Sequence, residues 1–238
     1  RLYINRSGQD NVGLFGYIET GGEVLNLGIE EGWIKGSDRT GILAGYSGGM
    51  VRNCYITGGV SGSYYVGGLV GKNYEGTITQ SYSTGRVSGS EYIGGLVGYN
   101  DYGTITQSYS TGGVAGDDYI GGLVGNNYYG TITQSYSTGG VSGSDYIGGL
   151  VGSNEGGAIT QSYSTGSVSG SGSIGGLVGY NRYGTITESY WDKDTSGQSE
   201  SEGGEGKTTA EMKQQATYVG WDFENVWSIE EGVSYPYL

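Results

Sequence analysis

The sequence contains no histidine, one cysteine and one proline among its 238 residues. Without histidine, the chain cannot perform Ser-His-Asp or Cys-His catalysis, and it cannot form the zinc site of an HExxH helix. The single Cys54 cannot form a disulfide within the chain, and it occupies the position that Ser81 and Ser108 hold in later repeats. We therefore expect Cys54 to be a small side chain facing the core rather than a crosslink to another molecule.

Basic residues and long apolar runs are also scarce. The 24 acidic residues outnumber the 11 basic ones and give a net charge of -13, which repels nucleic acid and anionic membrane surfaces. No apolar stretch of the sequence approaches the roughly 18 residues that suggest a membrane-spanning helix. We expect neither nucleic-acid binding nor membrane insertion. An acidic surface rich in Ser, Thr and Tyr favours an extracellular or cell-surface location.

The chain repeats one unit of 27 residues, which is built around the segment GGLVG. A β-branched residue further along the unit keeps the same spacing from near the start of the chain. A fixed period of this length is the signature of a solenoid, in which each coil buries its apolar face against the next. The GGLVG segments begin at Gly67, Gly94, Gly121, Gly148 and Gly175, and the β-branched positions are Val24, Val51, Ile78, Ile105, Ile132, Ile159 and Ile186.

This period predicts an all-β fold, a right-handed parallel β-solenoid (β-helix) with 27-residue coils. We expect about seven coils over residues 1–190, the first of them incomplete, and a small C-terminal capping segment over residues 191–238. The 53 glycines recur at fixed positions of the unit, so they are interpreted as turns rather than as disorder. Thr208 and Glu211 form a capping-box pattern, which predicts one short helix over residues 208–216. The tryptophans of the tail are expected to fold back over the last coil and close it.

Because the coils are in register, equal side chains are expected to stack from coil to coil. Asn100 and Asn127, for example, are predicted to hydrogen-bond along the stack, and the threonines on either side of Ile105 are predicted to point outward. A tyrosine ladder also recurs. Strand alternation leaves open whether it faces in or out, although the small residues beside it favour the outside. The candidate ligand face on this ladder comprises Tyr82, Tyr109, Tyr136 and Tyr163.

Acidic residues provide the remaining candidates for a chemical site. Asp192, Asp194 and Ser196 stand at alternate positions before Gly197, which is similar to the start of a calcium-binding loop. The glutamate expected at the twelfth position of such a loop is absent, so an acidic turn is the alternative interpretation, and no other cofactor is expected. The carboxylates elsewhere occupy variable loop positions, which argues against a glycosidase pair. We expect no enzymatic activity.

These repeats resemble the GLUG repeat family, named after its Gly-Leu-any-Gly core, over residues 13–190. The tail segments YWDKDTSGQ, TTAEMKQQATYVGWDF and VWSIEEGVSYPYL are similar to the region that often follows such repeats. The resemblance implies an extracellular, adhesin-like β-solenoid of the kind found in secreted and surface proteins of bacteria and archaea. In longer relatives a further strand usually precedes the position of residues 2–4, which implies that the first coil is cut.

Two functions remain open. The first is a non-catalytic extracellular structural protein, a surface or filament-forming module that assembles head-to-tail with other copies of itself through its solenoid ends. The alternative is an adhesin segment that binds glycans or a host surface protein through its tyrosine and threonine ladders, although tyrosine can also recur simply because it favours strands. The residues predicted to assemble are Leu2, Tyr3, Ile4, Val12, Leu14 and Phe15 at the first coil and Val226, Trp227, Ile229, Tyr235 and Tyr237 in the tail.

Overall fold

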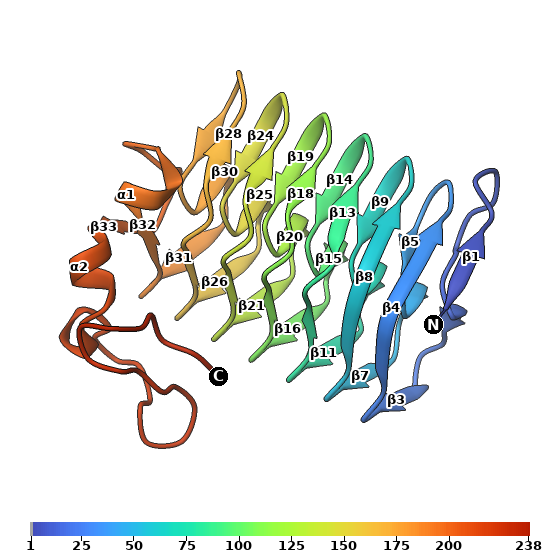
Figure 1. Cartoon of the computed structure of the whole chain (residues 1–238), viewed down its shortest axis with the longest axis horizontal. Coiled ribbons are helices and arrows are strands. Elements are labelled where there is room, and N and C mark those ends of the chain that lie inside the picture. The colour runs from blue at the N-terminus through green and yellow to red at the C-terminus, as the bar shows by residue number, and fades with distance from the viewer. Residues whose placement is uncertain (1) are drawn as a thin grey trace.

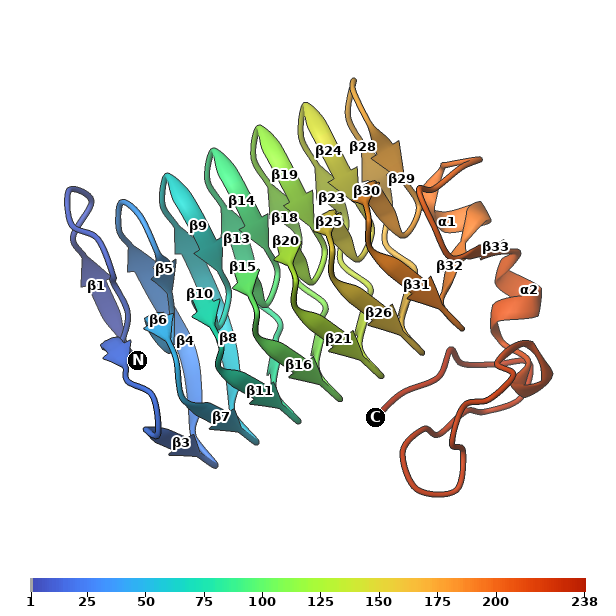
Figure 2. The same cartoon turned by 180° about the vertical axis from the view of Figure 1, so that it is seen from behind.

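Residues 2–238 are described by the computed structural model, and they form a stack of coils with a C-terminal cap at one end (Figure 1). Every strand pair between neighbouring coils is parallel, and the pairing joins residues 27 positions apart in the repeats, such as Ile78 with Ile105. The predicted parallel β-solenoid of about seven coils is therefore confirmed. The N-terminal coil and the cap lie at opposite ends of the stack, as Figure 2 shows from behind.

Four sheets run along the stack within the described residues. We name two of them after the side chains that they carry. The asparagine sheet contains β2 (Phe15–Ile18), β6 (Ala44–Ser47), β10 (Val70–Tyr74), β15 (Val97–Asp101), β20 (Val124–Tyr128), β25 (Val151–Glu155) and β30 (Val178–Arg182). The threonine sheet contains β3 (Glu23–Leu25), β7 (Met50–Arg52), β11 (Thr77–Thr79), β16 (Thr104–Thr106), β21 (Thr131–Thr133), β26 (Ala158–Thr160) and β31 (Thr185–Thr187).

The two other sheets complete each coil. The short sheet contains β5 (Thr40–Gly41), β9 (Tyr64–Gly67), β14 (Glu91–Gly94), β19 (Asp118–Gly121), β24 (Asp145–Gly148) and β29 (Ile174–Gly175). The wide sheet contains β1 (Tyr3–Asn5), β4 (Gly28–Lys35), β8 (Tyr55–Ser61), β12 (Tyr82–Ser83), β13 (Arg86–Ser88), β17 (Tyr109–Ser110), β18 (Val114–Ala115), β22 (Tyr136–Ser137), β23 (Val141–Ser142), β27 (Tyr163–Ser164), β28 (Val168–Ser169), β32 (Tyr190–Asp192) and β33 (Glu205–Lys207).

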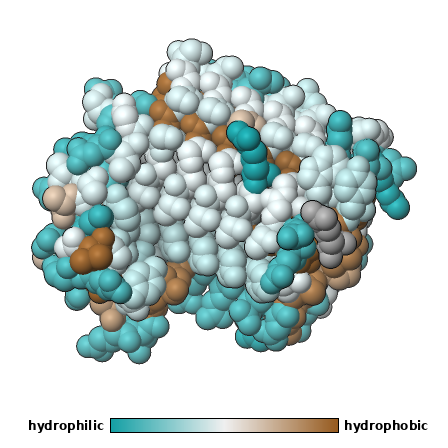
Figure 3. Space-filling model, in the orientation of Figure 1, coloured by the Kyte–Doolittle hydropathy of each residue, from teal (hydrophilic) through white to brown (hydrophobic). Residues whose placement is uncertain are grey.

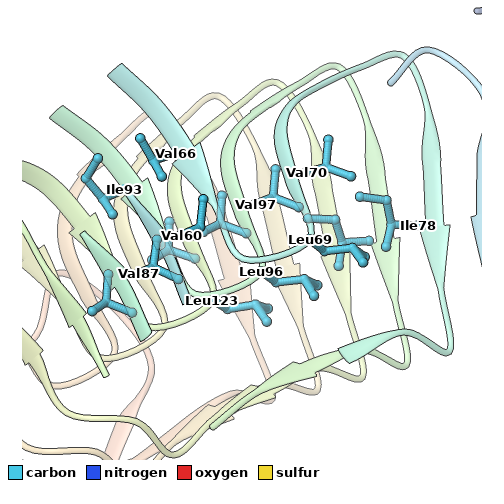
Figure 4. Packing of buried hydrophobic residues seen from close by; sticks show 14 of the residues in the cluster. Val60, Val66, Leu69, Val70, Ile78, Val87, Ile93, Leu96, Val97 and Leu123 are labelled. Carbon is cyan, nitrogen blue, oxygen red and sulfur yellow. The ribbon is translucent and has the colours of Figure 1, made fainter. Parts of the chain in front are cut away.

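The core is a column of aliphatic side chains that stack from coil to coil. Leu69, Leu96 and Leu123 are fully buried one above the other, and valines and isoleucines from the sheets surround them (Figure 4). The GGLVG segment supports this packing, because a Cβ atom on Gly94 would collide with the carbonyl oxygen of Val97. Cys54 is buried in the same core, as predicted. The repeat therefore places one aliphatic layer in each coil, which is the main source of stability.

Buried asparagines link the coils, as the register predicts. The Nδ2 atom of Asn73 donates to Oδ1 of Asn100 at 2.8 Å and to the carbonyl oxygen of Gly76 at 3.0 Å. Asn100 and Asn127 repeat both contacts with their own next coil. Because an unpaired amide in this interior would be costly, the ladder fixes the register of the stack.

The C-terminal end is closed differently from the expectation. Trp191 is buried against the last coil, and the backbone N–H groups of Leu177 and Val178 donate to the hydroxyl oxygen of Ser201 at 3.1 and 2.9 Å. Trp191 and residues 198–207 therefore cover the end of the core. The tail that follows lies along the side of the stack, so the prediction that its tryptophans close the end is wrong.

The cap contains two short helices and a 3-10 turn. Helix α1 (Lys193–Ser196) was not predicted, whereas α2 (Thr209–Met212) has the predicted capping box, with Thr208 and Glu211 as partners. The helix ends at Met212 rather than near residue 216, because the chain tightens into η1 (Gln215–Thr217). None of the helices within residues 2–238 is long and apolar enough to cross a membrane.

Candidate functional site

The tyrosine ladder faces outward, but the tail covers part of it. Neighbouring rings stack from coil to coil, with centroids 4.7 Å apart for Tyr82 and Tyr109 and 5.0 Å apart for Tyr136 and Tyr163. Tyr82 and Tyr109 are half-buried, whereas Tyr136 and Tyr163 are only 8% and 1% exposed. The predicted ligand face is therefore wrong for Tyr136 and Tyr163. Its open part runs from Tyr55, which stacks on Tyr82, to Tyr109.

The tail is held on the ladder by aromatic packing and by hydrogen bonds. Trp221 and Trp227 join the buried tyrosines in a second hydrophobic cluster that is separate from the core. The hydroxyl group of Tyr163 donates to the carbonyl oxygen of Pro236 at 2.5 Å. The indole N–H of Trp221 donates to the backbone carbonyl oxygen of Glu188 at 2.9 Å. Burial raises the pKa of Tyr163 well above its usual value. The tail is thus an integral part of this side of the molecule.

A second ladder of polar side chains lies beside the tyrosines. Its residues also recur every 27 positions, and each has a left-handed backbone that turns the chain between the threonine and wide sheets. The side chain of Gln107 donates to Gln134 at 3.3 Å, and Gln161 donates to Glu188 at 2.9 Å. This amide ladder consists of Asn26, Asn53, Gln80, Gln107, Gln134, Gln161 and Glu188. Sequence reasoning missed it, although its 27-residue spacing was available as a signal.

A groove of about 630 Å³ opens where the amide ladder, the exposed tyrosines and the edge of the tail meet. We call it the amide groove. Asn225 and Val226 of the tail form part of its wall. The ladder residues and neighbours that line it are Asn26, Arg52, Asn53, Gln80, Tyr82, Gln107 and Tyr109, and Leu238 also contacts it.

The side chains of Gln80 and Arg52 in the amide groove have no partner among the described residues. Asn53 donates to Oδ1 of Asn26 at 2.6 Å, and Gln107 is bound to the next coil. The side-chain amide of Gln80, between them, makes no hydrogen bond within residues 2–238, and the guanidinium group of Arg52 makes no ion pair there. The groove therefore presents a free side-chain amide and a free cation on neighbouring coils.

The candidate calcium ligands are used as a helix cap. Asp192 is fully buried, and its Oδ1 accepts from the backbone N–H groups of Asp194 and Thr195 at 2.8 and 3.2 Å. Its Oδ2 accepts from the hydroxyl groups of Thr209 and Tyr235, both at 2.7 Å. Within the part of the chain that the structure describes, no three His, Cys, Asp or Glu side chains are grouped as metal ligands. Both carboxylate oxygens of Asp192 are thus engaged within the chain, and Asp192 caps the turn that starts α1.

Ser196 is also engaged locally rather than directed at a common centre. It is buried, and its hydroxyl oxygen accepts from the backbone N–H of Gln198 at 3.2 Å. A carboxylate oxygen of Asp194 accepts from the backbone N–H of Thr209 at 2.9 Å. The contact between Asp194 and Thr209 ties α1 to α2.

The predicted assembly residues differ strongly between the two ends. Tyr3, Leu14 and Phe15 are exposed, Leu2 and Ile4 are partly buried, and Val12 is buried. The outer edges of β1, β2 and β3 pair with no other strand of the described chain. The first coil therefore combines exposed apolar side chains with free backbone groups.

The tail, in contrast, is already bound within the chain. Trp227 is only 2% exposed, Tyr235 donates to Asp192, and Tyr237 pairs with Ser228. Val226 and Ile229 pack against the second hydrophobic cluster. These contacts disfavour the predicted role of the tail in head-to-tail assembly, because releasing these residues would expose the aromatic cluster.

Comparison with known proteins identifies the repeat. Residues 62–88, 89–115, 116–142 and 143–169 each match the model of the GLUG motif. The resemblance to GLUG repeats is thus confirmed, and each matched motif has the length of one coil. Halomucin of Haloquadratum walsbyi (strain DSM 16790 / HBSQ001) is 44% identical over 70 residues, which make up 29% of this chain and 1% of halomucin.

Proposed function

We propose that this chain, whose residues 62–169 consist of four GLUG motifs, is a non-catalytic structural module of a surface-associated repeat protein. We further propose that it pairs with a second copy through the N-terminal end of its solenoid. The similarity to halomucin supports a surface role, since that name denotes a mucin-type protein. The net charge of -13 favours solubility outside a cell.

The surface of the stack is consistent with a structural role. Its outward positions are mostly Ser, Thr, Tyr and Gly, and the middle of the face in Figure 3 is coloured mainly white to pale teal. Lys72 and Asp101 of the asparagine sheet are already paired with each other, with their N and O atoms 2.7 Å apart. Such pairing uses these groups for the stack rather than for proton transfer.

The observation that carries the pairing proposal is the difference between the two ends. At the C-terminal end, Trp191 and Ser201 cover the core and satisfy backbone groups of the last coil. At the N-terminal end, three strands offer unpaired edges beside exposed Leu14 and Phe15. Open edges of this kind favour pairing with further strands. Two copies that meet at this end form a closed pair, because each then presents only its covered end outward.

Sedimentation velocity over a range of concentrations tests this proposal. The wild-type protein is expected to shift from single to paired molecules as concentration rises. Phe15→Lys places a charge on the exposed edge of β2, and we expect it to raise the dissociation constant at least tenfold, equivalent to about 1.4 kcal/mol.

Val233→Lys is the matched control, because it adds the same charge to a residue that is 65% exposed in the tail. It is expected to pair as the wild type does. A wild-type protein that remains single at every concentration, or equal pairing by Phe15→Lys, contradicts the proposal.

A second candidate function is ligand binding by the side of the stack. It is favoured by the open stretch of the tyrosine ladder between Tyr55 and Tyr109, beside the amide groove. Glycans or a surface protein of a host are the partners proposed for this face. This function does not depend on pairing, because the groove lies on the side and the proposed contact lies at the end.

A further inference from the structure

We infer that the amide groove binds a carboxylated oligosaccharide, with Arg52 as the carboxylate-binding residue and Gln80 as a hydroxyl-binding residue. The inference rests on the second function proposed above and gives it a site and a ligand class. Both residues line the groove, and neither side chain is bound to another described residue. A ligand can therefore engage both side chains without breaking an existing contact.

The position of Arg52 in the repeat marks it as an addition to the scaffold. In the threonine sheet Arg52 pairs with Thr79 in the next coil, and later coils also carry threonine at this position. The fold therefore does not require an arginine there. In a chain with a net charge of -13, an unpaired guanidinium group is a local site for an anion. Its planar fork of donors matches a carboxylate.

The amides beside Arg52 fit a ligand rich in hydroxyl groups. Asn53, Gln80 and Gln107 follow one another along the stack, one for each coil, at the spacing of about 4.8 Å between paired strands. Each amide can both donate and accept a hydrogen bond, as can a sugar hydroxyl. The phenol groups of Tyr82 and Tyr109 add further donors and acceptors along the same line. The groove volume of about 630 Å³ is typical of a small-molecule site.

The exposed tyrosines contribute their edges rather than their faces. The rings of Tyr55, Tyr82 and Tyr109 stack on one another at 5.2 and 4.7 Å, within 11° of parallel. Their faces are therefore occupied, and recognition depends on the hydroxyl groups and the amides. This arrangement suits a polar ligand that lies along the stack better than an apolar one.

An extended peptide fits the groove less well. Strand β12, which carries Tyr82, already pairs with β8 on one side and β17 on the other. Strand β7, which carries Arg52, likewise pairs with β3 and β11. No free strand edge is available in the floor for a peptide to extend the sheet. A polyanion with closely spaced charges is disfavoured as well. Arg52 can neutralise one of these charges, and the acidic protein repels the others.

Titration calorimetry with defined oligosaccharides tests the inference. The acidic probes are tetragalacturonate and a hyaluronan tetrasaccharide, and cellotetraose is the neutral probe. The wild-type protein is expected to bind at least one acidic probe at least tenfold more tightly than the neutral one. The difference is expected to shrink as salt is added, because the ion pair with Arg52 is exposed to solvent.

Two variants locate the site without disturbing the coils. Arg52→Thr introduces the residue that the following coils carry at this position, and Gln80→Glu introduces the residue that Glu188 provides in the same ladder. Arg52→Thr is expected to weaken binding of the acidic probe at least tenfold, and Gln80→Glu to abolish it by repulsion. Arg86→Ser is the control. It removes an equal charge from an exposed position outside the groove and copies Ser167 in a later coil, and binding is expected to be unchanged.

The outcomes separate the inference from the function on which it rests. If an acidic probe binds equally to the wild type and to Arg52→Thr, the amide groove is not its site and the inference is overturned. Ligand binding by another part of the side face then still stands as a proposal. Equal binding of neutral and acidic probes overturns the role of Arg52. The absence of binding by any probe up to millimolar concentration overturns both.

Discussion

Asp192 shows how the environment decides the role of a single carboxylate. It is fully buried and accepts four hydrogen bonds, two from backbone N–H groups and two from hydroxyl groups. These donors satisfy both oxygens of the buried carboxylate and connect β32 to α1, α2 and the tail. The buried carboxylate therefore serves to fasten the cap to the solenoid.

Asp192→Asn is expected to loosen the cap while leaving the coils folded. The amide replaces one acceptor oxygen by a donor that faces the hydroxyl groups of Thr209 and Tyr235, which costs about 1–3 kcal/mol. Tryptophan fluorescence during denaturant unfolding should shift to a lower midpoint. The control is Asp194→Asn, whose exposed side chain accepts, among residues 2–238, only from the backbone N–H of Thr209, and it should have a smaller effect. Equal midpoints for Asp192→Asn and the wild type would contradict this role.

The surroundings of individual residues in the repeat could be predicted from the sequence, because the position of a residue within the repeat unit fixes which side chains lie next to it. The inward position of Cys54 and the bonding of Asn100 to Asn127 follow from a spacing of 27 residues alone. The burial of Tyr163 could not be predicted in this way. It depends on the tail, whose sequence has no period that relates it to the coils.

At the scale of elements, the tail is a separate packing unit that is laid on the regular stack. Its hydrophobic cluster contains three ladder tyrosines together with Met212, Tyr218, Trp221 and Trp227. A capping box correctly predicted the start of α2, since that signal is local to four residues. The side of the stack on which the tail lies is determined by long-range aromatic contacts. For this reason the amide groove, which the tail borders, could not be placed from the sequence.

Alkaline pH is expected to release the tail. Burial, and the hydrogen bond to Asp192, raise the pKa of Tyr235 from 10.0 to about 12, and burial also raises the pKa of Tyr163 and Tyr218. The folded tail thus favours the neutral phenols. This stabilisation is complete below pH 10 and is lost as the pH rises through about 12.

The release can be followed by the fluorescence of Trp221 and Trp227, which should shift to longer wavelength between about pH 10 and pH 12. The far-UV circular dichroism of the coils should change at higher pH, because the aliphatic core contains no titrating group apart from Cys54. Ultraviolet absorbance of phenolate provides the reference for ionisation. Fluorescence that stays constant throughout this range would show that the tyrosines do not hold the tail.

At the scale of the whole molecule, the fold is a stack with two unlike ends and a grooved side. The parallel solenoid was predictable, because seven copies of a β-branched position at one spacing admit one regular arrangement of coils. The way in which the chain closes its C-terminal end was not, since Trp191 and Ser201 act through contacts that no repeat specifies. The unlike ends are the basis of the proposed pairing.

Negative-stain electron microscopy of the wild-type protein at several concentrations tests this central claim most directly. We predict single short rods at low concentration and rods of twice that length at high concentration, with the bulk of a tail at both outer ends. The doubled rods should not grow further, because Trp191 and the segment that contains Ser201 cover the core at each outer end. Single rods at every concentration, or fibres that lengthen without limit, would contradict the account.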